Sequence, residues 1–265
     1  MRGTQGSNRV LMLSGAVALG IVALAGAAQA QEWRWSVTPY MWASEVGVDV
    51  SINDHEVLER EADLADVLDS LDFMVQVHFE GQKGRHGLLL DLIYNDLGDD
   101  DRRFALDDPP GEVVVKGDLE MTILEAGGIF NPRGDGTGFA FLYGARVIDL
   151  DEEFDARYDF GPGSTPGRRY SASTTLLDGL VGARYVGVIS DRWSFHIRAD
   201  ASAGGSELTW NAWTGFGYAF GAAKQHAFLA GYRYMEIDFK EKDARAELEI
   251  QNKLGGFIAG VKFGF

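Results

Sequence analysis

The chain has 265 residues with 40 acidic side chains against 24 Lys and Arg, which gives a net charge of −16, and it contains no cysteine. This charge argues against a nucleic acid as partner, because binding to phosphate backbones needs a surplus of cations. The lack of cysteine excludes disulfides as a source of stability.

The first thirty residues have the layout of a secretory signal peptide. Arg2 and Arg9 precede an apolar run of small residues that closes on Ala28-Gln29-Ala30. A membrane anchor is the alternative, but the Ala/Gly-rich run and its A-x-A ending favour export and cleavage. We therefore expect residues 1–30 to be removed and residues 31–265 to form a single domain. That domain keeps 22 basic and 40 acidic residues, a net charge of −18, and lacks any apolar stretch of the length of a helical span.

Apolar and polar residues alternate repeatedly after residue 31. In WSFHIRADASA, residues 193–203, one side of the strand is wholly apolar and the other wholly polar. Such segments are about ten residues long, the length with which a tilted strand crosses a bilayer. The alternation predicts ten strands, near 32–51, 72–82, 87–97, 113–130, 138–154, 170–187, 193–203, 207–220, 226–240 and 246–265.

The connections between these segments differ in length. Short turns at 83–86, 131–138, 189–192 and 221–225 face longer links at 52–71, 98–112 and 155–169. An even number of strands with short turns on one rim and long loops on the other is typical of an outer-membrane barrel with both termini in the periplasm. The predicted fold class is therefore all-β: a membrane-spanning antiparallel up-and-down barrel. A soluble sandwich or lipocalin-like barrel carries the same alternation and is the competing architecture.

Two local departures from the strand pattern qualify this prediction. The alternation shifts near Ser44, Leu124 and Leu254, which we interpret as bulges or as strands that continue above the membrane, so eight or twelve strands remain alternatives. In the first long link, EADLADVLDSL (61–71) carries apolar residues at helical spacing and predicts a short helix.

The aromatic residues Trp33, Trp35, Tyr40, Trp42 and Trp193 are interpreted as interfacial.

The last strand ends on alternate apolar residues. These residues resemble the C-terminal recognition signal of bacterial outer-membrane proteins, which the barrel-assembly machinery reads. The candidate assembly signal comprises Phe257, Val261, Phe263 and Phe265.

A family resemblance follows from these features together. The exported start, the opening strand EWRWSVTPYMWAS, the repeated GAR and GYR segments and the Phe ending resemble a family of small proteobacterial outer-membrane β-barrels, porin-like or OmpW-like, most of which have no assigned function. The resemblance covers residues 31–265 and implies the outer membrane of a Gram-negative bacterium. It carries over no catalytic residue.

A set of charged residues shares one side of the predicted strands. Gly144-Ala-Arg146, Gly182-Ala-Arg184 and Gly231-Tyr-Arg233 each place Gly and Arg on one face, and Gly260-Val-Lys262 repeats the pattern. The glycines leave room for long side chains to cross the interior. If the apolar face meets lipid, a lumen charge network is expected, made of Arg146, Arg184, Arg233, Lys262, Glu80, Asp91, Glu120, Asp178, His196, Arg198 and Asp200.

This network admits two interpretations. It is structural filler for a narrow barrel, or it is a charged constriction, because rings of charge set selectivity in pores. The function we expect is a narrow charge-lined channel or a barrel that binds small solutes. A structural or surface-interaction barrel that acts through acidic loops is the alternative. The expected surroundings are outer-membrane lipid and lipopolysaccharide, and the expected state is a monomer.

Catalytic and metal-binding patterns are weak. Ser194-Phe-His196 places a base two residues from a hydroxyl, but outer-membrane lipases run His-x-Ser, and no G-x-S-x-G elbow is present. A lipid-modifying hydrolase is therefore the third possibility, and we expect no enzyme. The five histidines lack zinc-ligand spacing, and the acidic clusters lack a calcium-loop pattern, so no metal or cofactor is expected.

Overall fold

The computed structural model describes residues 33–52, 55–62, 65, 70–98, 102–106, 111–159, 168–243 and 246–265. Twelve strands occupy almost all of these ranges and form one antiparallel sheet. Within these ranges no helix combines the length and apolarity needed to cross a membrane. The strands are β1 (Arg34–Ile52), β2 (His55–Ala62), β3 (Leu71–Lys83), β4 (His86–Gly98), β5 (Arg102–Leu106), β6 (Gly111–Phe130), β7 (Gly138–Asp159), β8 (Arg168–Val188), β9 (Trp193–Gly204), β10 (Leu208–Phe220), β11 (His226–Asp243) and β12 (Ala246–Gly264).

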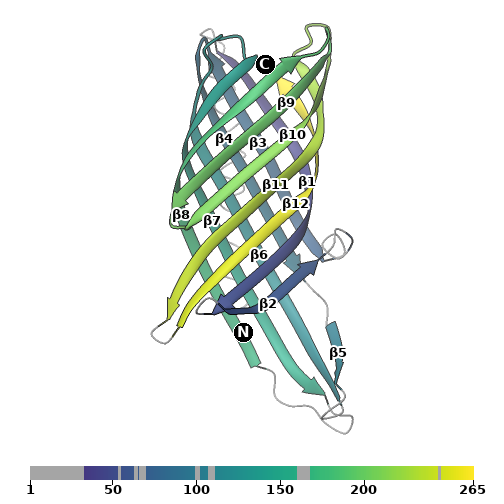
Figure 1. Ribbon diagram of the computed structural model, residues 1–265. Helices are drawn as coiled ribbons and strands as arrows, with labels where there is room; N and C mark the ends of the chain where they lie inside the picture. The colour runs from purple at the N-terminus through teal and green to yellow at the C-terminus, as the bar shows by residue number, and fades with distance from the viewer. Residues whose placement is uncertain are drawn as a thin grey trace, which may run out of the picture.

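Ten of these strands close into an up-and-down barrel (Figure 1). Each of β1, β3, β4 and β6 to β12 pairs with its neighbours along the chain, and β12 pairs with β1 from Ser36↔Gly264 to Ile52↔Leu248. The ten predicted strands and the all-β barrel are confirmed. The eight- and twelve-stranded alternatives for the barrel wall are wrong.

Two further strands lie where the sequence predicted loops. In the link at 52–71, β2 pairs with the end of β1, and in the link at 98–112, β5 pairs with the start of β6. The segments HEVLEREA and RRFAL are short and charged and lack the sustained alternation of the other strands. These two links therefore extend the sheet, which the prediction missed.

The helix predicted over 61–71 falls mainly outside the described residues. Residues 63–64 and 66–69 are not described, and Ala65 alone is helical. The first two residues of the predicted helix, Glu61 and Ala62, belong to β2, and Leu71 begins β3. The predicted helix is wrong at both of its ends.

The four short turns gather at one end of the barrel, which we call the turn rim: residues 84–85, 131–137, 189–192 and 221–225. This is the upper end in Figure 1, where the C-terminus lies. Trp35 and Phe265 exchange backbone hydrogen bonds of 3.0 and 2.9 Å there. In the second turn, the Thr137 N–H and hydroxyl donate to Asp135 and hold the pKa of that carboxyl below its ordinary value. The opposite end, the loop rim, carries β2, β5 and the projecting ends of β6 and β7.

On the outer face of the barrel, the part of each strand that adjoins the turn rim is apolar. On β7 the outward residues Phe139, Phe141 and Tyr143 are 65%, 55% and 54% exposed, and the first outward charge is Asp149. A stretch of this length, repeated around the wall, has the height of a bilayer core. A soluble barrel would present the polar face outward, so the apolar exterior excludes the lipocalin-like alternative.

The inner face carries the polar partners of these residues. Ser36, Thr38 and Gln82 are buried within the lumen near the turn rim. Tyr40 and Trp42 also point inward, because they share the face of Ser36 on β1, whereas Trp35 stacks on Phe79 on the outside with ring centroids 5.1 Å apart. The interfacial assignment is therefore wrong for Tyr40 and Trp42.

Candidate functional site

The lumen contains three successive zones between the turn rim and the loop rim. A cavity of about 690 Å³ occupies the turn side and is called here the turn-side cavity. Beyond it lies a charge network, and beyond that an apolar layer.

Glu125 of β6 is the centre of the charge network. Its Oε1 accepts hydrogen bonds from Arg146 Nη2 at 2.7 Å and Nε at 3.1 Å, and its Oε2 accepts one from Arg198 Nη2 at 2.6 Å. The carboxylate is 1% exposed, and the two arginines are 0% and 7% exposed. Charged groups this deeply buried are stable only when they are paired and hydrogen-bonded, and here both conditions are met.

Asp200 of β9 completes the pairing of both arginines. Arg198 Nε donates to it at 2.7 Å, Arg146 contacts its other oxygen, and Asn211 Nδ2 donates to it at 2.8 Å. Room for this carboxylate comes from Gly182, where an added Cβ would lie 2.4 Å from the Asp200 Cβ. The glycine of the second GAR segment therefore does make space in the lumen, as predicted.

Asp178 of β8 is linked to the network through serines. The Ser202 hydroxyl accepts from Arg146 Nη1 at 2.9 Å and donates to Asp178 at 2.9 Å. Asp178 also accepts from the Ser206 hydroxyl and from the backbone N–H groups of Gly205 and Ser206. This carboxylate therefore also holds the β9–β10 turn.

Arg233 of β11 joins the network to the turn-side cavity. Its Nε donates to Asn211 at 2.7 Å, and its guanidinium lies 4.5 Å from the centre of the Trp42 ring. Its buried Nη2 has no hydrogen-bond partner, although a Glu125 oxygen lies 3.9 Å away. Beside it the Tyr40 hydroxyl donates to Asp91 at 2.6 Å, and Asp91 also contacts His78 Nδ1 at 2.8 Å.

The turn-side cavity has a second, partly buried ion pair. Arg184 binds Glu80 in a bidentate manner at 2.5 and 2.7 Å, and Lys262 lines the same cavity. No carboxylate of the described ranges lies within ion-pair distance of the Lys262 ammonium group. Cationic side chains outnumber acidic ones along the cavity wall: Arg34, Arg184, Arg198, Lys224, Arg233 and Lys262 against Glu80, Asp91 and Asp135.

His196 also lines this cavity and contacts Ser194. The Ser194 hydroxyl lies 2.8 Å from His196 Nε2, and the imidazole stacks on the Trp213 ring. Among the described residues no carboxylate is hydrogen-bonded to this histidine, since Glu80 and Asp91 serve Arg184, His78 and Tyr40 instead. A base and a hydroxyl are thus adjacent, but the third group that would orient the base is not assembled.

The apolar layer fills the loop half of the lumen. It consists of inward side chains, all 6% exposed or less: Trp42, Ile93, Met121, Ile123, Ile148, Leu150, Leu176, Met235, Ile237, Phe239 and Leu254. The interpretation of the charge network as the filler of the lumen is therefore wrong for this half. The pairing of β1 with β12 and of β6 with its neighbours keeps one register through Ser44, Leu124 and Leu254. The apparent shifts are therefore not bulges, and inward apolar residues such as Ile123 and Leu254 weaken the alternation there.

Ten of the eleven predicted network residues lie on the inner face, and Glu120 does not. Glu120 lies opposite Asp96 on β4 and Asp151 on β7 and is exposed. All three are on the outer face, between the apolar band and the loop rim. It is five positions from Glu125 on an uninterrupted strand, so the two carboxylates point to opposite faces. The sequence reasoning missed Glu125 because the parity of β6 was assigned one residue out of step. In the β6–β7 ladder Glu125 lies opposite Arg146 and Ile123 opposite Ile148, a pairing that the pattern of a single strand does not give.

The four residues of the candidate assembly signal lie on one face of β12. Phe257, Phe263 and Phe265 are 70%, 42% and 54% exposed on the outer side. Within the described ranges, no group of three or more His, Asp or Glu side chains is placed to hold a metal ion.

Comparisons with known proteins identify no family. No protein-family model and no curated protein matches the chain. Similar solved structures include the outer membrane protease OmpT from Escherichia coli, with 9% identity and a TM-score of 0.49 over 89% of this chain and 98% of that one. The translocator domain of the autotransporter NalP from Neisseria meningitidis has 15% identity and a TM-score of 0.42 over 97% of each chain. The attachment invasion locus protein Ail of Yersinia pestis has 12% identity and a TM-score of 0.30 over 88% of this chain and all of that one.

These structures are outer-membrane barrels, the class that the sequence resembles. Their low identities and TM-scores carry over no residue, ligand or activity. The fold assignment therefore rests on the strand pairing of this chain.

Proposed function

We propose that this chain is an outer-membrane barrel with a closed lumen whose turn-side cavity binds a small anionic solute. The observation that carries the proposal is the cavity of about 690 Å³ with six cationic and three acidic side chains along its wall. A cavity of this size suits a small ligand, and a few placed polar groups suffice to fix its orientation.

The membrane location is supported by the apolar exterior and by the exported start of the sequence. Both termini would then lie in the periplasm, because the turn rim carries the end of β12 and the start of β1. The alternating outward residues Phe257, Val261, Phe263 and Phe265 would be read by the barrel-assembly machinery. We propose a monomer, since β12 and β1 pair with each other and close the sheet into a barrel.

The anion preference rests on two cations that have spare binding capacity. Lys262 has no described acidic partner, and the buried Nη2 of Arg233 has no hydrogen-bond partner. An unsatisfied buried donor is costly, and an anionic ligand would satisfy it. Lys262 and Arg233 lie six residue pairs apart along the β11–β12 ladder, so a small ligand would contact one of them, and Lys262 lines the cavity together with Arg184.

Replacing one cation should weaken binding without unfolding the barrel. With inorganic pyrophosphate as the probe, we expect Lys262→Gln to lower affinity about tenfold, since a charge-assisted contact contributes roughly 1.4 kcal/mol. Titration calorimetry on the refolded barrel measures this. Arg192→Gln is the matched control, because Arg192 lies on the turn rim, bonds to the Ala219 carbonyl and does not line the cavity. If both variants weaken pyrophosphate binding equally, the effect comes from the general charge of the surface, which contradicts the proposal.

The barrel should not conduct ions. The residues around Glu125, namely Arg146, Arg198 and Asp200, and the apolar layer are more than nine-tenths buried, which argues against a water path between the two rims through the described part of the chain. We expect the refolded chain to remain silent in planar bilayers, with the heat-modifiable gel shift as the check that a barrel formed. Steady, ion-selective conductance would contradict the proposed closed binding barrel and favour the narrow charge-lined channel.

A surface role is the second candidate, and one specific feature favours it. Asp96, Glu120 and Asp151 form a row across β4, β6 and β7, on the outer face between the apolar band and the loop rim. Such a row would face the phosphorylated part of lipopolysaccharide, where divalent cations bridge like charges. Pyrophosphate binding that is absent at every concentration would make this surface the better candidate.

A further inference from the structure

The wall of the barrel is incompletely paired between β1 and β3. These strands form six residue pairs, from Arg34↔Gln82 to Pro39↔Val77. On the same edge β1 next pairs with β2, beginning at Val46↔Ala62. Between these points, residues 40–45 have no strand partner on this edge in the described part of the chain, whereas their other edge is paired with β12 throughout. We call this gap the β1–β3 seam.

The side chain of Gln76 closes the turn-side end of the seam. The Trp42 backbone N–H donates to Gln76 Oε1 at 2.5 Å, and Gln76 Nε2 donates to Asn95 Oδ1 at 3.1 Å. The side chain therefore replaces one rung of the missing backbone ladder. Beyond it, toward the loop rim, the two strands are separated by a pocket of about 60 Å³.

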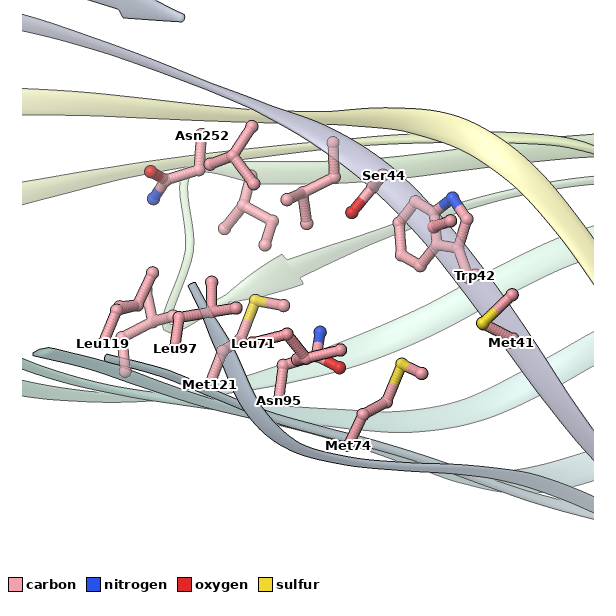
Figure 2. Close-up of a pocket in the computed structure, with 15 residues that line it drawn as sticks. Met41, Trp42, Ser44, Leu71, Met74, Asn95, Leu97, Leu119, Met121 and Asn252 are labelled. Atoms are coloured by element: carbon pink, nitrogen blue, oxygen red, sulfur yellow. The ribbon is translucent and has the colours of Figure 1, made fainter. Parts of the chain in front are cut away.

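Residues from both faces of β1 line this pocket. Met41 and Ala43 belong to the outer face, and Trp42 and Ser44 belong to the inner face. Figure 2 shows Met41, Trp42 and Ser44 on one side of the pocket and Met74, Asn95 and Leu97 on the other. Its inner wall is the apolar layer, with Met121, Leu150, Ile237 and Leu254.

The lining suits a hydrocarbon and no charged group. Among the described residues that line the pocket none is acidic or basic, and the polar ones are Ser44, Asn95 and Asn252. On the outside, Met41 and Phe73 flank the seam with 48% and 52% of their surface exposed, and Phe73, opposite Asp96, marks the loop-rim edge of the apolar band. On the turn-rim side of that edge the medium outside a membrane barrel is lipid, so the Met41 end of the pocket adjoins acyl chains.

We propose that the β1–β3 seam is a lateral entry through which one acyl chain of an outer-membrane lipid inserts its end into the apolar layer. The narrow pocket admits a single chain and leaves the headgroup outside. Gln76 and Trp42 separate this site from the turn-side cavity, so the two sites are independent. The proposal rests on the bilayer location of the barrel and not on the binding of an anionic solute.

Photolabelling from the acyl chain tests this entry. The refolded barrel is placed in vesicles of a phosphatidylcholine that carries a diazirine at the end of one palmitoyl chain, irradiated, digested and mapped by mass spectrometry. We expect label on the inward residues Met74 and Met121 as well as on outward residues such as Phe139 and Phe141. The outward label shows that the barrel is in the bilayer, so a failure of insertion is distinguished from a closed seam.

Two variants that narrow the seam sharpen the result. Ser44→Phe fills the pocket from inside, and Ala43→Trp covers its mouth from the lipid side without entering the lumen. Each is expected to lower the inward label about fivefold or more and to leave the outward label unchanged, because a filled apolar pocket excludes its ligand. Ala199→Trp on the outer face of β9, away from the seam, is the control and should change neither label.

Two results would overturn the proposal. Label confined to outward residues in the wild-type barrel means that the acyl chain stays outside. Inward label that survives in both Ser44→Phe and Ala43→Trp means that the probe reaches the apolar layer by another route.

Discussion

Glu125→Ala is expected to lower the free energy of unfolding by about 3–5 kcal/mol, because removing one member of a buried ion cluster leaves its partners uncompensated. Glu125 accepts three of the hydrogen bonds that Arg146 and Arg198 donate, and Asp200 alone cannot replace it. Urea unfolding of the barrel in lipid vesicles, followed by the heat-modifiable gel shift, measures the difference.

Glu120→Ala is the matched control for this prediction. It removes the same side chain from the same strand, but on the outer face beside Asp96 and Asp151. Its effect should stay within about 0.5 kcal/mol, as for most exposed positions. If Glu120→Ala proves the more destabilising of the two, the inward assignment of Glu125 is wrong.

Trp42→Ala should have an effect of similar size for a different reason. Trp42 is 2% exposed and lies between the charge network and the apolar layer, with Arg233 against its ring. Truncating a buried aromatic side chain leaves a cavity and costs about 3–5 kcal/mol. The same urea titration of the vesicle-bound barrel, read by gel shift, gives the value.

Trp210→Ala provides the comparison on the outer face. Trp210 packs on Tyr234 with ring centroids 5.0 Å apart and faces the lipid. Loss of that aromatic contact should cost about 1 kcal/mol. Equal losses from both tryptophans would contradict the inference that the loop half of the lumen is a packed core.

The wall of the barrel was predictable from the sequence because each strand obeys one rule. Lipid requires an apolar outward residue at every second position, and tight turns require residues such as Gly84, which has a φ of +56°. The ten strands and four short turns follow from these two requirements. The inward positions obey no such rule, since a lumen can be filled by charges or by apolar side chains.

This freedom explains the errors about the interior. Ile237 and Phe239 lie inward, directly after Arg233 and Met235 on the same face, so the face changes from charged to apolar without any change of register. In the sequence this change is visible only as a smaller difference in polarity between the inward and outward faces. The pairing that distinguishes Glu125 from Glu120, and the missing pairs between β1 and β3, depend on contacts between distant segments.

The pairing of β1 with β12 also limits how the chain can fold. These strands lie at opposite ends of the described sequence, and their ladder runs from Ser36↔Gly264 to Ile52↔Leu248. The wall therefore closes only after almost the whole chain is available, and contacts of such long sequence separation make folding slow. Until that moment both terminal strands expose unpaired edges, which invite pairing with another copy. Folding inside the membrane must therefore be delayed until the last strand arrives, or the open sheet must be held by a partner that covers its edges.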